Sequence, residues 1–223
     1  EIVSFLRNNL GKPGTNGFVP PALPSFEDGK VKGYNYDPEK AKKLLKDAGF
    51  GENNKFPEIT LNTTPHRKEL AELLQKQWSQ TLGIKVNIEI NNFAAHQDIM
   101  VKGGAKFFSA AWIADYPDEE NFLACFYSKN LTPNGFNYTG YKNPEFDKIY
   151  EKVHQEKDGF KRHEIYQKLD QMVMNECAII VLYYDEVLRL HQKGIVNLPP
   201  SRMNHLNLER VDIAAINNDT ASK

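Results

Sequence analysis

Asp115 is the carboxylate whose position in the sequence is hardest to explain by folding alone. It follows the apolar run 107–113 and precedes Pro117, so it lies outside the helix expected after it. A carboxylate that leaves a buried strand is expected to face a specific cation. That cation is either a structural lysine or arginine or a charged group of a ligand, and the residues alone leave both readings open. Trp112 and Tyr116 would wall a ligand site, although Trp112 could equally belong to the core.

The acids that follow Asp115 have a simpler explanation. Asp118 and Glu119 precede a short helix expected over 121–126, where acidic side chains cap the first turn and complement the helix dipole. A carboxylate pair such as Asp115 and Glu119 could also serve glycoside hydrolysis, with one member as general acid. Nothing in the sequence identifies that acid, so a carboxylate-dependent hydrolase is kept only as a weaker alternative.

Sequence signatures of other catalytic and metal sites are missing. There is no HExxH, CxxC, GxSxG, P-loop or GxGxxG pattern. Cys125 and Cys177 fit no metal spacing and are expected to be small buried hydrophobes. We therefore predict no catalytic residue, no metal site and no cofactor. The histidines are scattered without ligand spacing: His66, His96, His154, His163, His191 and His205.

Composition narrows the function classes. The 223 residues carry 28 Lys plus Arg against 29 Asp plus Glu, and no basic stretch stands out, which argues against nucleic acid as the main partner. Hydrophobic residues make up 40%, enough for a folded core. The longest apolar run, 177–184, is far shorter than the ~18 residues that a membrane-spanning helix needs.

A strand–helix–strand pattern predicts the fold class. Alternating apolar residues indicate strands over 58–63 and 84–90, with a helix over 67–82 between them that ends at Gly83. This order indicates a βαβ unit with parallel strands. The run 107–113 is apolar on both sides and is expected to be a third strand, covered by helices on both faces.

The remaining elements follow from local signals. Residues 11–34 are rich in glycine and proline and are expected to form an extended connector without helix. A helix begins at Asp37-Pro38-Glu39, with a capping residue and a proline in its first turn, and Gly49 stops it. Further helices are expected over 94–102, 144–154 and 161–176, and further strands over 178–184 and 186–190.

Five stretches, in order over about residues 34–190, resemble the extracellular solute-binding proteins, family 5, which are the peptide- and nickel-type receptors of ABC importers. The stretches are YDPEKAKKLLKDAGF at 36–50, LGIKV at 82–86, WIADYPD at 112–118 followed by NFL at 121–123, YKNPEFD at 141–147 and IVLYY at 180–184.

The resemblance implies two α/β lobes that close over a ligand, of which this chain is the carboxyl-terminal part. We expect residues 1–33 to be a connector from the first lobe, and 34–185 to form the second, periplasmic-binding-protein-like lobe, with a βαβ-containing mixed sheet flanked by helices. Residues 186–223 would be a return segment and tail. Residues 1–6 look like the end of a longer amphipathic helix, so a longer natural protein is expected.

The resemblance also implies a ligand site. In peptide-binding members the aspartate of the WIADYPD motif receives the α-ammonium group of the ligand, which assigns that role to Asp115. Trp112 and Tyr116 would wall the cleft. Relatives commonly bind the ligand carboxylate through a basic residue, and some carry it just before this motif. Residues 107–111 hold no base here, so Arg67 is the candidate, or else a solvated residue at a helix start.

The expected function is that of the substrate-binding component of an ABC importer. It would capture oligopeptides between its lobes, deliver them to the permease membrane subunits, and catalyse no reaction. We expect a monomer in the periplasm or on the outer face of the cytoplasmic membrane, with a lipid anchor at the missing N-terminus as one possibility. A receptor for another ligand, such as an oligosaccharide, stays open as an alternative.

Overall fold

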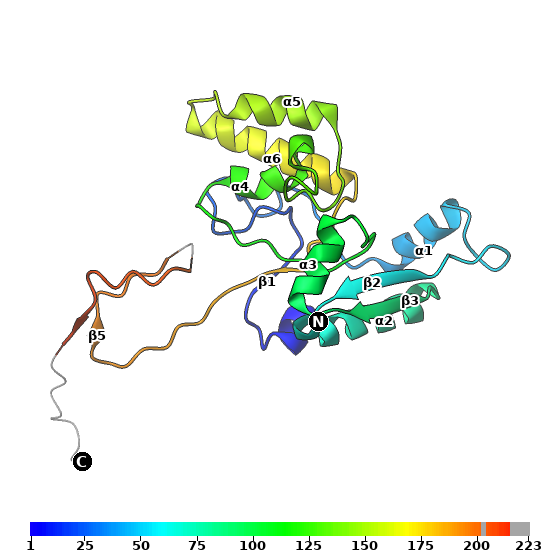
Figure 1. Cartoon of the computed structure of the whole chain (residues 1–223), viewed down its shortest axis with the longest axis horizontal. Coiled ribbons are helices and arrows are strands. Elements are labelled where there is room, and N and C mark those ends of the chain that lie inside the picture. Colours follow the sequence, from blue (N-terminus) through cyan, green and yellow to red (C-terminus); the bar gives the residue numbers. More distant parts are fainter. Residues whose placement is uncertain (202–203, 215–223) are drawn as a thin grey trace, which may run out of the picture.

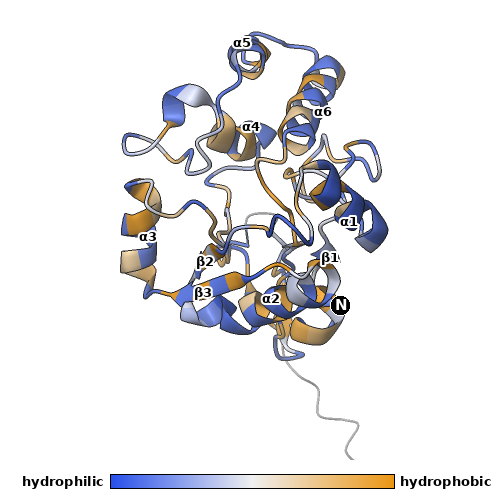
Figure 2. Cartoon of the chain, turned by 90° about the vertical axis from the view of Figure 1, so that its right-hand side faces the viewer, coloured by the Kyte–Doolittle hydropathy of each residue, from blue (hydrophilic) through white to orange (hydrophobic). Residues whose placement is uncertain are grey.

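The structure, a computed structural model, describes residues 1–201 and 204–214 and separates into two main packing regions. One is the βαβ region, residues 59–90, and the other is the helical region, residues 119–175. Figures 1 and 2, viewed at right angles to each other, both place α4, α5 and α6 at one end of the body and β2, β3 and α2 at the other. No helix among the described residues is both long and apolar enough to cross a membrane.

The βαβ region has the predicted order and direction. Strand β2 (Ile59–Thr63) pairs in parallel with β3 (Val86–Ile90), and α2 (Lys68–Leu82) connects them. Gly83 adopts a left-handed conformation with φ of 66° directly after α2, which suits a residue without a Cβ at the end of a helix. The prediction of a parallel βαβ unit is confirmed.

The prediction of a third, doubly covered strand over 107–113 is wrong. The backbone of this segment pairs with that of β2 only at Asn62, whose N–H donates to Phe107 O at 3.0 Å and whose carbonyl accepts from Ser109 N at 2.9 Å. Beyond Ser109 the chain leaves β2, and Ile113 is 82% exposed. The apolar composition was interpreted as burial on both faces, but burial depends on which elements cover the segment. Regular pairing in the described chain is therefore limited to three two-stranded sheets.

The helical region encloses the larger core. It contains α4 (Glu119–Leu123), a 3-10 turn (Ala124–Phe126), α5 (Pro144–Val153) and α6 (Gly159–Asn175). Asn143 and Asp158 cap α5 and α6 by accepting backbone N–H groups, which supports the predicted helix starts. Side chains that are almost fully enclosed line the contact between these helices: Leu123, Phe126, Phe146, Val153, Tyr166, Leu169 and Val173.

The connector over 11–34 contains no helix, as predicted, but it is bound to the body. Its strand β1 (Lys12–Pro13) pairs antiparallel with β4 (Tyr183–Tyr184). Asp170 of α6 accepts hydrogen bonds from Phe18 N at 2.7 Å and Val19 N at 3.1 Å. A Cβ at Gly17 would clash with the Asp170 carboxylate, so this close approach requires glycine. The connector therefore packs as part of the helical region.

The remaining helices match their predictions within a residue or two. Helix α1 (Pro38–Asp47) begins at Asp37, whose side chain accepts from Lys40 N, and α3 (Phe93–Val101) follows β3. Residues 2–6 form one short π-helical turn. Cys125 is buried as expected, whereas Cys177 is exposed, because it lies just beyond the end of α6 with φ of 52°.

The segment after β4 extends away from the body as an arm (Figure 1), which we define as residues 186–201 and 204–214. The strand predicted over 186–190 is wrong, and that over 178–184 is confirmed only for β4. The arm instead pairs β5 (Ile195–Val196) with β6 (Asp212–Ile213). The predicted tail over 215–223 lies outside the described residues. Large apolar side chains of the arm are exposed: Val187, Leu188, Leu190, Leu206, Leu208 and Ile213.

Candidate functional site

The candidate site is the loop over 110–118, which joins the two regions. It begins after Ser109, beside the carboxyl end of β2, and ends at the first turn of α4. Ser109 Oγ lies 2.7 Å from Thr63 Oγ1, the last residue of β2. In α/β folds, ligands meet the loops at the carboxyl ends of parallel strands, so the loop has the expected location for a ligand site.

Asp115 is exposed, and its carboxylate forms no ion pair with any residue in the described ranges 1–201 and 204–214. The sequence left two partners open for Asp115, a structural lysine or arginine and a charged group of a ligand. The first is not found among the described residues. The assumption that Asp115 leaves a buried strand was wrong, and water solvates its charge. The negative charge of Asp115 adds to burial in raising the pKa of Cys125 to about 12, which keeps that thiol protonated.

Asn121 connects Asp115 to Trp112. Its Oδ1 accepts from Trp112 Nε1 at 2.9 Å and from Asp115 N at 3.2 Å, and its Nδ2 donates to Asp115 Oδ2 at 3.4 Å. Trp112 is half-buried and stacks on Phe136 with ring centroids 5.0 Å apart. One face of Trp112 thus packs against the helical core, as the core interpretation predicted.

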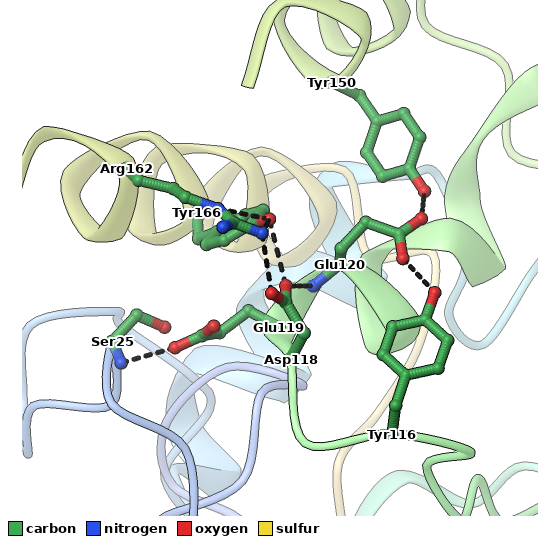
Figure 3. A network of polar contacts seen from close by, with 8 residues as sticks. All are labelled: Ser25, Tyr116, Asp118, Glu119, Glu120, Tyr150, Arg162 and Tyr166. Carbon is green, nitrogen blue, oxygen red and sulfur yellow. Dashed lines mark hydrogen bonds and ion pairs between the residues drawn. The ribbon is translucent and has the colours of Figure 1, made fainter. Parts of the chain in front are cut away.

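Tyr116 projects from the other side of the loop and is 46% exposed. Its hydroxyl donates to Glu120, whose second carboxylate oxygen accepts from Tyr150 of α5 (Figure 3). Partial burial and then the Glu120 carboxylate raise the pKa of Tyr116 above its ordinary value, so the phenol remains a hydrogen-bond donor. Glu120 therefore holds an exposed aromatic side chain in a defined direction.

The end of the loop is attached to α6 through Asp118. Asp118 caps α4 by accepting from Glu120 N at 2.9 Å, which supports the capping interpretation. The same carboxylate accepts from Arg162 Nη2 at 2.6 Å and from the Tyr166 hydroxyl at 3.0 Å (Figure 3). A half-buried ion pair with added hydrogen bonds fixes geometry better than an exposed one.

Glu119 has a different role from the capping that its position suggested. It is 4% exposed, and its Oε1 accepts from Ser25 N at 2.6 Å, so it fastens the 11–34 connector to α4. Figure 3 shows Glu119 directed toward Ser25 and Glu120 directed toward Tyr116 and Tyr150. Because Glu119 is buried and hydrogen-bonded to the connector, it is not free to act beside Asp115 as the hydrolase alternative requires.

Arg67 follows β2 through the 3-10 turn Pro65–Arg67 and precedes α2. Its backbone N–H donates to Thr64 O at 2.9 Å, and its half-buried side chain forms no ion pair with another described residue. Arg67 and the 110–118 loop both leave from the carboxyl end of β2. The structure thus brings their segments to one edge, and the role of Arg67 stays a prediction.

Sequence reasoning missed Asn121 and Phe136 as parts of the site. Asn121 is a polar residue in the otherwise apolar run 121–126, and a buried amide requires hydrogen-bond partners, so this signal was available. Phe136 lies in a polar loop that gave no indication of packing. Across the described part of the chain, no group of three or more His, Cys, Asp or Glu residues is placed to hold a metal ion.

A βαβ region and a helical region joined by this loop are consistent with a solute-binding protein, and the chain was compared with known protein families. Residues 1–134 match the family described as bacterial extracellular solute-binding proteins, family 5 Middle. The chain belongs to this family of solute-binding proteins, as its sequence motifs indicated.

Several similar proteins are named as peptide-binding proteins. The chain is 31% identical to the dipeptide-binding protein DppE of Bacillus subtilis over 89% of this chain and 38% of DppE. It is 30% identical to the oligopeptide-binding protein OppA of the same organism, over 74% of this chain and 31% of OppA. The structure of the periplasmic binding protein DppA from Helicobacter pylori in complex with the peptide STSA matches with a TM-score of 0.73 and 27% identity, over 82% of this chain and 35% of that one. The chain thus spans between three and four tenths of the length of each of these relatives.

Proposed function

We propose that this chain is part of the substrate-binding component of an ABC importer that captures oligopeptides. The observation that carries the proposal is Asp115, an exposed carboxylate held by a buried amide and lacking a cationic partner among the described residues. The relatives named as dipeptide- and oligopeptide-binding proteins support peptide as the ligand class. Asp115 would bind the α-ammonium group of the peptide.

A charge-assisted hydrogen bond suits this task. An ammonium group carries three donors and a full charge, and a carboxylate accepts through both oxygens. Only Oδ2 of Asp115 is engaged within the described chain, at 3.4 Å to Asn121, so Oδ1 remains available for a ligand. The bond would strengthen once a closing lobe excludes water, because Coulomb attraction grows as the local dielectric falls.

The backbone before Asp115 supports recognition of a peptide main chain. After Ser109 N has donated to Asn62 O, residues 110–114 form no backbone–backbone hydrogen bond with any other described residue. Such an extended segment can add a peptide as a strand, which recognises the main chain irrespective of side chains. Trp112 and Tyr116 would then wall the bound peptide, and Arg67 would face its carboxylate end.

The exposed apolar side chains of the arm support the proposed division of the chain. Residues 1–33 would connect to a first lobe, 34–185 would form the second lobe, and 186–223 would return to the first. The exposed apolar side chains of the arm would be covered by that first lobe. We further propose a monomer without catalytic activity that delivers peptide to permease subunits. It would act in the periplasm or on the outer face of the cytoplasmic membrane, where a lipid anchor would hold it.

Native mass spectrometry tests the proposal directly. The intact polypeptide that carries these 223 residues is purified without refolding, as wild type, as Asp115→Asn and as Asp47→Asn. Asp47 is an exposed carboxylate at the end of α1 and serves as the matched control. We expect bound masses that differ by amino-acid residues in the wild type and the control and that are depleted in Asp115→Asn. Protein without adducts, or adducts spaced by hexoses, would contradict peptide capture.

A further inference from the structure

Asn121 is a buried polar side chain that the proposed function has not yet used. It is 4% exposed and lies in α4 next to Phe122 and Leu123, which belong to the helical core. A buried amide without partners is costly, so its side chain must be satisfied by specific contacts. All three of its side-chain hydrogen bonds within the described chain go to the 110–118 loop.

The chemistry of these contacts is specific to an amide. The carbonyl oxygen of Asn121 accepts from the Trp112 indole N–H and from the Asp115 backbone N–H, while its NH₂ group donates to the Asp115 carboxylate. An aspartate at position 121 would lack the donor and would repel Asp115. A serine would be too short to make all three contacts.

The backbone of Asn121 is fixed because helix α4 is held in place at its start and packed into the core. Helix α4 is capped by Asp118, whose carboxylate is bound by Arg162 and Tyr166 of α6. Leu123, two residues further along α4, is fully enclosed. The Asn121 side chain therefore orients the exposed Asp115 carboxylate relative to the packed helix α4. Without this hydrogen bond the carboxylate would rotate freely in water.

We infer that Asn121 is the positioning residue that fixes the Asp115 carboxylate relative to Trp112 and thereby sets the preference for ligands with a free α-ammonium group. This inference rests on the proposed function. A carboxylate that is already oriented loses less side-chain entropy when it binds a cation. Without Asn121, Asp115 keeps its charge but must be ordered by the ligand, so discrimination between a free and a blocked amine should fall.

The first test measures this discrimination. Dissociation constants of trialanine and N-acetyltrialanine are measured by calorimetry on the intact polypeptide, as wild type, Asn121→Ala and Asn130→Ala. Asn130 is the matched control, because its amide donates to Ala124 O at 2.9 Å in the same region and forms no hydrogen bond with the described 110–118 loop. We expect the preference for the free amine to fall roughly tenfold in Asn121→Ala and to persist in Asn130→Ala.

A double-mutant cycle separates positioning from general destabilisation. Asp115→Asn is introduced into the wild type and into Asn121→Ala, and its effect on trialanine affinity is compared. We expect the loss caused by Asp115→Asn to be roughly tenfold smaller when Asn121 is absent. Equal losses in both backgrounds would mean that Asn121 acts on the fold alone and would overturn the inference.

The second test needs no ligand. The Trp112 indole N–H signal of the intact polypeptide is assigned by its loss in Trp112→Phe, and its exchange with solvent is followed by NMR. We expect exchange at least several-fold faster in Asn121→Ala and unchanged exchange in Asn130→Ala, because among the described residues it is Asn121 that accepts this proton. Unchanged exchange in Asn121→Ala would show that the contact is absent and would overturn the inference.

The combined outcomes distinguish the two proposals. Faster indole exchange with an unchanged free-amine preference would overturn positioning of Asp115 while leaving peptide capture intact. A wild type that binds both peptides equally, or neither, would overturn the proposed function and the inference with it, whereas the indole measurement would still report the Asn121 contact. Should Asn121→Ala fail to fold, Asn121→Ser replaces it and is expected to give the same two changes.

Discussion

The helical region and the βαβ region differ sharply in how much apolar surface they bury. In the helical region α6 alone buries four apolar or aromatic residues, among them the fully enclosed Leu169 and Val173. In the βαβ region the buried apolar residues are Leu61, Ala71 and Val86, and α2 buries only Ala71. Since burial of apolar surface is the main stabilising contribution to folding, the helical region should carry most of the stability of the described chain.

This difference bears on the candidate site. The 110–118 loop starts beside the thinly packed β2 but is fixed by residues of the strongly packed α4 and α6, through Asn121 and through the Asp118–Arg162 ion pair. Asp115 should therefore keep its position when the βαβ region moves. Arg67, by contrast, belongs to the region with the smaller core and should be the more adjustable end of the site.

The largest expected effect comes from a matched pair of core truncations. Leu169→Ala in α6 and Leu61→Ala in β2 remove the same side chain from sites that are 0% and 3% exposed. We expect Leu169→Ala to cost about 4–5 kcal/mol of the free energy of unfolding and Leu61→Ala about 2–3, because the smaller cluster relaxes around the cavity more easily. Urea denaturation measures both. Equal costs would contradict the contrast between the regions.

A second prediction concerns the attachment of the connector to α6. Burial of Asp170 raises its carboxyl pKa from 3.8 to about 6, although hydrogen bonds from Phe18 N and Val19 N oppose the rise. The folded state thus binds a proton more tightly than the unfolded state between about pH 4 and pH 6, and stability falls as the pH rises through this window.

We therefore expect the stability of the wild type relative to Asp170→Asn to be roughly 2 kcal/mol greater at pH 4 than at pH 7, as measured by urea denaturation at both pH values. Asp147→Asn is the control for loss of a carboxylate acceptor, because Asp147 accepts from Ser128 N but is only half-buried. A relative stability that does not change with pH would show that Asp170 ionises normally within the fold.

The smallest expected effect is the loss of stability on removal of one ion pair from each region. Arg162 and Asp118 have side chains 36% and 29% exposed, and Tyr166 adds hydrogen bonds to both. Lys85 and Glu58 of the βαβ region are 66% and 55% exposed. We expect Arg162→Ala to cost about 1 kcal/mol and Lys85→Ala to have no measurable cost, since exposed pairs are screened by water. Thermal unfolding at low and high salt measures the difference, and a larger loss in Lys85→Ala would contradict it.

Local signals predicted the elements well because their causes are local. The cap at Asp37, the glycine stop at Gly83 and the strand predicted over 58–63 each depend on a few neighbouring residues, and each is found in the structure. The strands predicted over 107–113 and 186–190 failed for a different reason. Their apolar composition was read as burial, whereas burial depends on which distant elements cover the segment.

The candidate site shows the same limit. Asp115 could be singled out from its place after an apolar run, since that is a feature of the sequence. The contact of Glu119 with Ser25 spans 94 residues, and the contacts of Asn121 depend on how the loop folds back over α4. These contacts do not follow from the spacing of residues in the sequence. The candidate ligand-binding residues could therefore be named from the sequence, whereas Glu119 and Asn121, which fix the surrounding structure, could not be assigned these roles.

The most direct test of the account is the affinity of the intact polypeptide for trialanine and N-acetyltrialanine, compared between wild type and Asp115→Asn by titration calorimetry. Removing a carboxylate that binds an ammonium group should weaken trialanine binding roughly 30-fold or more. Binding of the acetylated peptide should hardly change, because it has no charge for Asp115 to bind. Equal affinity of both variants for trialanine would contradict the central claim that Asp115 receives the α-ammonium group of a peptide.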